Sequence, residues 1–185
     1  MNPQEFLNIA SYLYNLSTPQ LHTSPEIIRR THVNRAYYYL YHLARKETIA
    51  QLEDKENFHN LPEWLNKDHI HLKEKFRDHK LLRHFYEKLY DETNYDEARK
   101  VHHILSRYNT YRILADYHID TCNPSIGRYR LNFQNPNPQN PSWKELTPPT
   151  LQKRGNELVE SICNLFSNRL KNEDTTLYTI ITKIL

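Results

Sequence analysis

Glycine is scarce in this chain of 185 residues, which contains only Gly127 and Gly155. Phosphate-binding loops and dinucleotide-binding folds need several glycines, because their backbone approaches a phosphate closely. The composition therefore excludes P-loop and Rossmann chemistry.

Cysteine is equally rare. Cys122 and Cys163 lie in no pattern typical of a nucleophile, and two isolated cysteines predict free thiols rather than a disulfide framework.

Long apolar runs are missing as well. No stretch of about 18 apolar residues could span a bilayer, and residues 1–5 do not have the basic-then-apolar pattern of a signal peptide. We therefore expect a soluble protein of the cytoplasm with no membrane contact. A hydrophobic content of 38% over 185 residues is enough for one core, so a single domain over 1–185 is expected.

The charge balance is only mildly basic. The 25 lysines and arginines exceed the 22 acidic residues by a formal net charge of +3. This value is compatible with RNA or a nucleotide as partner, but it is far from that of a polybasic binder. The 14 tyrosines could offer stacking surfaces to bases, although most tyrosines on helices belong to the core.

Helix signals dominate the chain. Asn2-Pro3, Ser24-Pro25 and Thr147-Pro148 each place a capping residue before a proline at the first helical position. Alternation with period two, which would indicate strands, is scarce. The predicted helices cover residues 3–16, 25–54, 68–91, 95–121 and 148–171.

Proline marks one long loop. Between residues 26 and 123 only Pro62 occurs, whereas six prolines crowd residues 124–149. Residues 123–146 are therefore predicted to form an Asn/Pro-rich loop. The fold class that follows is all-α, a bundle of long antiparallel helices with an additional C-terminal helix. The apolar tail over 175–185 is predicted to form a short docking helix or a dimer contact, and docking is favoured over disorder.

Arg112 is the most unusual residue of the predicted helices. At 100° per residue it falls in the middle of an apolar stripe. That stripe consists of Val101, Leu105, Tyr108, Ala115 and Ile119. A guanidinium held there must find acceptors, and Asp116, one turn later, is the nearest candidate. Either this ion pair only ties helices together, or Arg112 is kept for handling phosphate.

A second Arg/His pair lies on the earlier helix. Arg35 and His42 are two turns apart and fall within about 20° of one helix face. This face points away from the apolar stripe of the same helix, towards water, a partner helix or a second subunit. Taken alone, the pair is typical of a solvated polar face.

Together the two segments resemble the HEPN superfamily (higher eukaryotes and prokaryotes nucleotide-binding domain), over about residues 24–121. The segment from Arg35 to His42, RAYYYLYH, is similar to the signature Arg-x-Tyr-Tyr-Ala-x-Phe-His of small prokaryotic members. The later segment resembles the family motif of an Arg, four to six residues and a His. Here five residues separate Arg112 from His118.

The resemblance implies an all-α bundle that commonly forms a homodimer, in which two Arg/His motifs face each other across a cleft. It also implies a metal-independent endoribonuclease. Many such proteins are toxins or defence effectors encoded beside an antitoxin, frequently a minimal nucleotidyltransferase. Other relatives have no Arg/His pair and only bind nucleotides.

The expected chemistry assigns roles to three residues. Arg112 would clamp the phosphate, Asp116 would orient Arg112, and His118 would act as base or acid, with 2′,3′-cyclic phosphate ends as product. On an unbroken helix, positions 112 and 118 lie about 120° apart. Convergence therefore requires a helix end near Tyr117, or motifs from two subunits.

Four further residues form the second candidate site, where they line the RNA path or complete the active site across a dimer. They are Arg35, Tyr38, His42 and Tyr117.

A non-catalytic protein that binds a nucleotide or a toxin–antitoxin partner fits the composition equally well. A carboxylate-bridged metal site would need two Glu-x-x-His pairs. Only Glu56–His59 is present, so no metal and no cofactor are expected.

Overall fold

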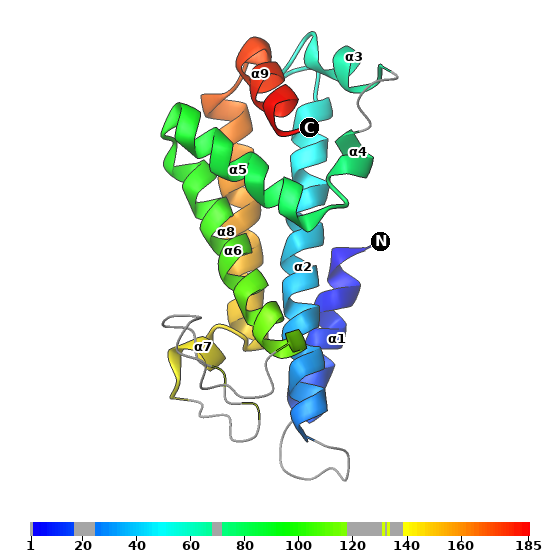
Figure 1. Cartoon of the computed structure of the whole chain (residues 1–185), viewed down its shortest axis with the longest axis vertical. Coiled ribbons are helices and arrows are strands. Elements are labelled where there is room, and N and C mark those ends of the chain that lie inside the picture. Colours follow the sequence, from blue (N-terminus) through cyan, green and yellow to red (C-terminus); the bar gives the residue numbers. More distant parts are fainter. Residues whose placement is uncertain (1, 17–24, 68–71, 118–130, 132, 134–138) are drawn as a thin grey trace. The chain divides into compact units, whose positions relative to one another are not determined.

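The computed structural model describes residues 2–16, 25–67, 72–117, 131, 133 and 139–185. Within these residues the chain is helical and forms no strand, so the all-α prediction is confirmed (Figure 1). Among the described helices, none combines the length and the apolar character needed to cross a membrane.

The chain forms two compact units, and each is described by itself. Unit 1 comprises Met1–His42 and Ser106–Asn156, and unit 2 comprises Leu43–Leu105 and Glu157–Leu185. The expectation of a single domain over 1–185 stays a prediction.

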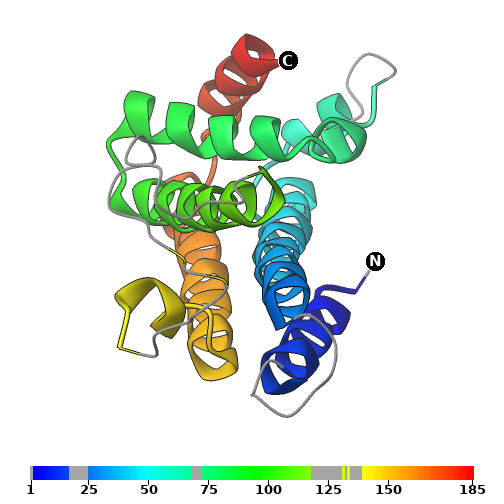
Figure 2. The same ribbon diagram turned by 60° about the horizontal axis from the view of Figure 1, so that its bottom comes forward.

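Unit 1 contains α1 (Pro3–Leu16), the first part of α2 (Pro25–Glu53), the last part of α6 (Asp96–Tyr117), α7 (Pro141–Lys144) and the start of α8 (Pro148–Asn164). Helix α1 lies alongside the first turns of α2 in both views (Figures 1 and 2). Its buried residues Pro3, Phe6, Leu7 and Ala10 follow the helical period and form one face.

His32 ties the elements of unit 1 together. Its side chain is buried, and its two ring nitrogens lie 2.8 Å from the carbonyl oxygens of Ala10 and Leu146. One imidazole of α2 thus contacts both α1 and the segment between α7 and α8. Tyr108 of α6 adds a second link, because its hydroxyl donates to the carbonyl oxygen of Glu145 over 2.6 Å.

Unit 2 contains the end of α2, α3 (Leu61–Leu65), α4 (Leu72–Lys75), α5 (His79–Thr93), the first turns of α6, the end of α8, the π-helix η2 (Leu165–Arg169) and α9 (Asp174–Ile184). Helix α9 packs against α5, as Figure 2 shows. Its apolar face is buried and consists of Leu177, Ile180, Ile181 and Ile184. The tail of the chain therefore forms the docked helix that its apolar character predicts.

The predicted helix over 68–91 is divided in the structure. Helix α4 ends at Lys75, and the side chain of Asp78 then caps α5 by accepting the N–H of Lys80 over 2.7 Å. Helix α5 ends where Asn94 adopts a left-handed conformation with φ 56°. Asp78, inside the predicted helix over 68–91, is therefore the start of a new helix.

Short helices also form where loop was predicted. Helix α7 lies inside the predicted loop over 123–146, because the Asn140 side chain accepts the N–H of Ser142 and Pro141 begins the helical turn. The rest of that loop lies largely outside the described residues. Helix α8 ends at Asn164 rather than at 171, and η2 continues it as a π-helix.

Candidate functional site

Arg112 lies at the edge of the core of unit 1. Its side chain is 23% exposed, and its Cζ atom lies 5.7 Å and 5.9 Å from the ring centroids of Tyr37 and Tyr38 on α2. Contacts of a guanidinium with aromatic faces at this distance are favourable. Arg112 is therefore packed against α2 and still reaches the surface, rather than being sealed in the core.

Asp116 holds the guanidinium from one side. Nε of Arg112 donates to Oδ2 of Asp116 over 3.1 Å, which confirms the predicted ion pair. The other oxygen, Oδ1, accepts from Nδ2 of Asn34 over 2.7 Å. Both oxygens of the carboxylate are thus engaged, one by α6 and one by α2.

The terminal nitrogens of Arg112 are differently placed. Within the described part of the chain, the bond from Nε to Asp116 is the hydrogen bond that Arg112 makes. Nη1 and Nη2 therefore have no acceptor among the described residues. Two parallel N–H donors on a fixed plane match the geometry of two phosphate oxygens.

Aromatic rings connect this arginine to the second predicted pair. We call Phe6, Tyr38 and His42 the ring cluster. The ring of His42 stacks on Phe6 at 4.9 Å and on Tyr38 at 6.1 Å between centroids, and Cζ of Arg35 lies 5.9 Å from the Phe6 ring. The sequence left water, a partner helix or a second subunit open as the surroundings of Arg35 and His42. The structure shows a partner helix, because Phe6 belongs to α1.

The structure thus brings together five of the seven predicted site residues in unit 1. These are Arg35, Tyr38, His42, Arg112 and Asp116. Tyr117 is the last described residue of α6 and is 70% exposed. His118 lies outside the described residues, so its expected convergence with Arg112 stays a prediction.

Three residues of this site, Asn34, Tyr37 and Phe6, were not predicted from the sequence. Tyr37 stands inside the quoted motif and could have been noted from its place one residue before Tyr38. Asn34 lies one helical turn before Tyr38, which is a weak signal for a shared face. Phe6 gave no signal beyond its place in the apolar stripe of α1.

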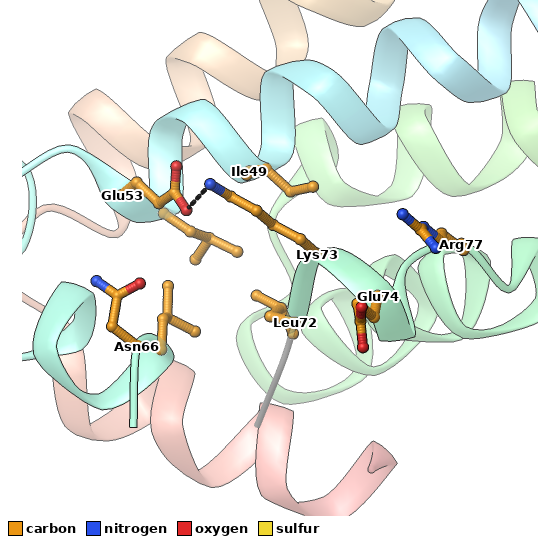
Figure 3. A pocket seen from close by; sticks show the side chains of 9 residues that line it. Ile49, Glu53, Asn66, Leu72, Lys73, Glu74 and Arg77 are labelled. Carbon is orange, nitrogen blue, oxygen red and sulfur yellow. Dashed lines mark ion pairs between the residues drawn. The ribbon is translucent and has the colours of Figure 1, made fainter. Parts of the chain in front are cut away.

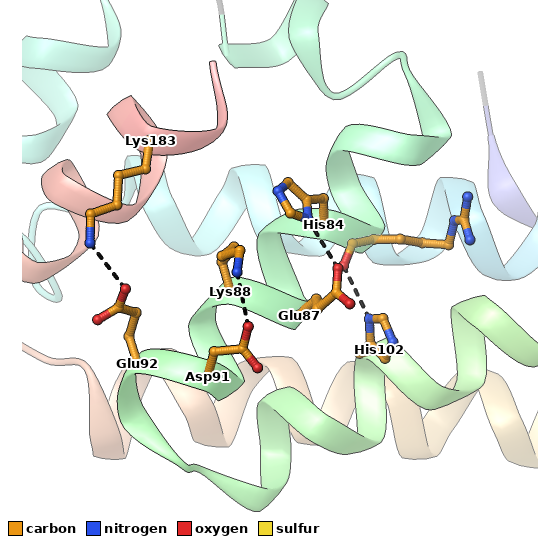
Figure 4. Close-up of polar contacts among 8 residues, drawn as sticks. His84, Glu87, Lys88, Asp91, Glu92, His102 and Lys183 are labelled. Carbon is orange, nitrogen blue, oxygen red and sulfur yellow. Dashed lines mark hydrogen bonds and ion pairs between the residues drawn. The ribbon is translucent and has the colours of Figure 1, made fainter.

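Two histidines of unit 2, His84 and His102, bond to groups of α5. Nδ1 of His84 bonds to Oε2 of Glu87 over 3.0 Å, and Nδ1 of His102 bonds to the carbonyl oxygen of Arg83 over 3.2 Å (Figure 4). The bond from His84 is the main cause that lowers the pKa of Glu87. Among the residues the structure describes, no group of three His, Cys, Asp or Glu side chains could hold a metal ion.

Cys163 is held as a thiol in unit 2. Its Sγ donates to Oε1 of Glu47 over 3.3 Å. Burial and the neighbouring carboxylate together raise the pKa of Cys163 to about 11. Because the thiolate is the reactive form, this cysteine is a poor nucleophile at neutral pH. Cys122 lies outside the described residues.

A cavity of about 480 Å³ also belongs to unit 2. Its apolar lining consists of Ile49, Leu52, Leu65 and Leu72. Lys73 of α4 reaches across to Glu53 of α2 in an ion pair of 2.7 Å (Figure 3). None of the predicted site residues that the structure describes lines this cavity.

Comparison of the chain with protein-family models, with curated proteins and with solved structures finds no match. The resemblance to the HEPN superfamily therefore rests on the two short motifs that begin at Arg35 and Arg112. The described parts of both motifs lie in unit 1, on α2 and α6.

Proposed function

We propose that the protein is a metal-independent endoribonuclease of the HEPN type. The observation that supports this proposal most directly is the hydrogen bonding of the Arg112 guanidinium. Asp116 fixes its guanidinium through Nε, and Nη1 and Nη2 have no acceptor within the described residues. Tyr38 lies against both Arg112 and His42, so a cation and an imidazole flank one ring.

The proposed reaction is attack of a ribose 2′-hydroxyl on the adjacent phosphorus. A base removes the 2′ proton, the bond from phosphorus to the 5′ oxygen breaks, and an acid protonates that oxygen. The products are a 2′,3′-cyclic phosphate and a 5′-hydroxyl. Arg112 binds the non-bridging oxygens and stabilises the charge of the transition state. Asp116 orients Arg112 from the side that phosphate does not use.

Two histidines are proposed to move protons. His118 is the first candidate, from the spacing of the motif, and His42 is the second, because its ring reaches Tyr38 beside Arg112. An imidazole suits this role because its ordinary pKa lies near 6.5. Arg35 and Tyr117 are proposed to contact the RNA, and the exposed ring of Tyr117 suits stacking on a base.

The biological setting proposed is that of a toxin or defence effector in the cytoplasm. The finer fold proposed is the HEPN-like bundle of antiparallel helices, working as a homodimer. An antitoxin such as a minimal nucleotidyltransferase is the proposed regulator. These statements rest on the motif resemblance alone.

The decisive experiment is incubation of the full chain with total RNA in the presence of a chelator. We expect cleavage that leaves 2′,3′-cyclic phosphate ends. Arg112→Ala and His118→Ala should each lower the rate at least about 100-fold, the usual effect of losing a transition-state donor or a general acid. If no RNA is cut, or if the chelator stops cutting, the proposal is wrong.

Two matched variants separate chemistry from general charge effects. Arg99 and His103 lie on the same helix, α6, but in unit 2, and both are exposed. Arg99→Ala and His103→Ala should keep the wild-type rate. A loss equal to that of Arg112→Ala would instead indicate a non-specific effect of charge or of helix stability.

A second candidate is a non-catalytic protein that binds a nucleotide. The observation in its favour is the ion pair itself, since Asp116 partly neutralises Arg112. Nucleotide binding that depends on Arg112, without any cleavage of RNA, would select this function.

A further inference from the structure

A hollow of about 330 Å³ lies in unit 2, between α3 and the start of α9. Two aromatic side chains line it, Trp64 from α3 and Tyr178 from α9. Their ring centroids are 4.6 Å apart and their planes meet at 65°, so the two rings form a corner. We call this hollow the Trp64–Tyr178 pocket. Tyr178 is 44% exposed, so its ring is accessible from solvent.

A carboxylate lies at the same pocket without a cation to balance it. Oδ2 of Asp174 accepts the N–H of Asn60 over 2.7 Å, whereas its Oδ1 is buried and has no hydrogen-bond partner among the residues that the structure describes. No ion pair to Asp174 occurs within the described residues. The exposed residues Glu63 and Lys67 also line the pocket, and neither forms an ion pair with a described residue. Two carboxylates and one ammonium leave the lining negative.

From these observations we propose that the Trp64–Tyr178 pocket binds a quaternary ammonium group. The faces of Trp and Tyr rings attract cations, and this attraction grows when the cation is removed from water. The uncompensated charge of Asp174 acts in the same direction. The negative lining and the aromatic corner thus favour the same kind of ligand.

The burial of the Oδ1 atom of Asp174 determines which kind of cation the pocket favours. Its free oxygen is covered, so a ligand in the pocket gains no direct hydrogen bond from it. A primary ammonium is strongly hydrated and would lose water without gaining that bond. A trimethylammonium group has no N–H to satisfy, so it enters at a lower cost. This binding site is independent of the proposed nuclease activity.

The test uses choline and its neutral isostere 3,3-dimethylbutanol, in which carbon replaces the nitrogen. Titration of the full chain by calorimetry should show choline binding at least about tenfold more tightly, which corresponds to a cation–π and charge term near 1.4 kcal/mol. Equal affinity of the two compounds, or no binding of choline at about 20 mM, overturns the proposal.

Two variants locate the binding. Asp174→Asn removes the charge and keeps an oxygen for the N–H of Asn60, so it should weaken choline at least about fivefold and leave the isostere unchanged. Tyr178→Leu should weaken choline to a similar degree. Trp143→Phe, a change at the tryptophan of unit 1, should have no effect. Choline binding that survives Asp174→Asn and Tyr178→Leu unchanged, in protein with wild-type far-UV circular dichroism, contradicts the assignment.

A third experiment identifies whether the quaternary ammonium group belongs to a soluble ligand or to a lipid. Vesicles of phosphatidylcholine present the same headgroup on a surface. Binding of free choline without binding of vesicles identifies a soluble ligand, and vesicle binding that choline competes away identifies a lipid headgroup. Vesicle binding that persists in Tyr178→Leu, without competition by choline, counts against the pocket.

Discussion

Among the individual residues of the site, Asn34, Asp116 and Arg112 form a hydrogen-bonded relay, in which the carboxylate lies between the amide and the guanidinium. Asn34 donates to one oxygen of the carboxylate, and Arg112 donates to the other. The amide thus fixes Asp116, and Asp116 fixes the plane of the guanidinium. Asn34 is therefore a positioning residue for the proposed reaction rather than a group that touches RNA.

Substitution of Asn34 tests this relay. Asn34→Ala removes the donor to Oδ1, and Asn34→Asp places a second negative charge beside Asp116. Loss of a hydrogen bond to a charged group costs about 1–3 kcal/mol, so we expect kcat/KM for RNA cleavage to fall about tenfold in Asn34→Ala and further in Asn34→Asp. Rates and unfolding free energies of both variants should be measured together.

The control for this prediction is Asn156→Ala. Asn156 is an exposed residue of α8 in unit 1, and its side chain bonds only to Gln152 of the same helix among the described residues. Its removal should leave the rate unchanged. A wild-type rate in Asn34→Asp would show that the orientation of Arg112 does not depend on Asn34.

At the scale of elements, His32 is the residue through which α1, α2 and the segment before α8 meet. Burial lowers its pKa, and the hydrogen bonds to the carbonyl groups of Ala10 and Leu146 oppose that shift without overcoming it. A neutral imidazole carries one N–H, so it donates to only one of the two carbonyls. The neutral form is nevertheless the one that folding favours.

The stability of the protein should therefore depend on pH through His32. The unfolded chain binds a proton at a pKa near 6.5, whereas the folded chain binds it at a lower pKa. The contribution of His32 is fully present above about pH 6.5 and is lost as the pH falls towards the folded pKa. The slope reaches at most about 1.4 kcal/mol per pH unit for one proton.

Urea denaturation at several values between about pH 7.5 and 5 measures this slope. The wild type should lose stability as the pH falls, and His32→Gln should show a smaller loss. His84→Gln provides the control, because the side chain of His84 is 40% exposed and contacts Glu87 on the surface. An identical slope in the wild type and in His32→Gln would contradict the prediction.

Some helix boundaries can be predicted from residues that lie next to them in the sequence, and others cannot. The starts of α1, α2 and α8 are predictable because a proline at the first helical position is a signal within two residues. The break between α4 and α5 depends on Asp78, whose cap competes with a continuous helical pattern. The short helices α3 and α7 give too few residues for any period to emerge.

In the folded chain, some contacts of the candidate site join neighbours on one helix, and others join segments that are far apart in the sequence. The pair of Arg112 and Asp116 was predictable because its members lie four residues apart on one helix. Asn34 lies 82 residues from Asp116, and their contact depends on which helices pack together. The contact of Phe6 with Tyr38 and His42 depends likewise on how α1 packs on α2. A pattern of period 3.6 identifies an apolar face but not its partner.

The division into two units gave no signal in the sequence either. Domain boundaries usually fall in exposed linkers rich in proline, glycine and polar residues. Here the chain passes between the units inside α2, α6 and α8. The Pro-rich stretch over 123–146 is the most linker-like segment of the sequence, and its described residues belong to unit 1 alone.

These three crossings have a consequence for fragments of the protein. Proteases cut by preference at exposed loop tips, and helical backbone is protected by its own hydrogen bonds. Each step from one unit to the other lies within a helix, so the boundary offers no such tip. Digestion of the native protein should nick its loops and still leave each half covalently joined to the other through intact helices.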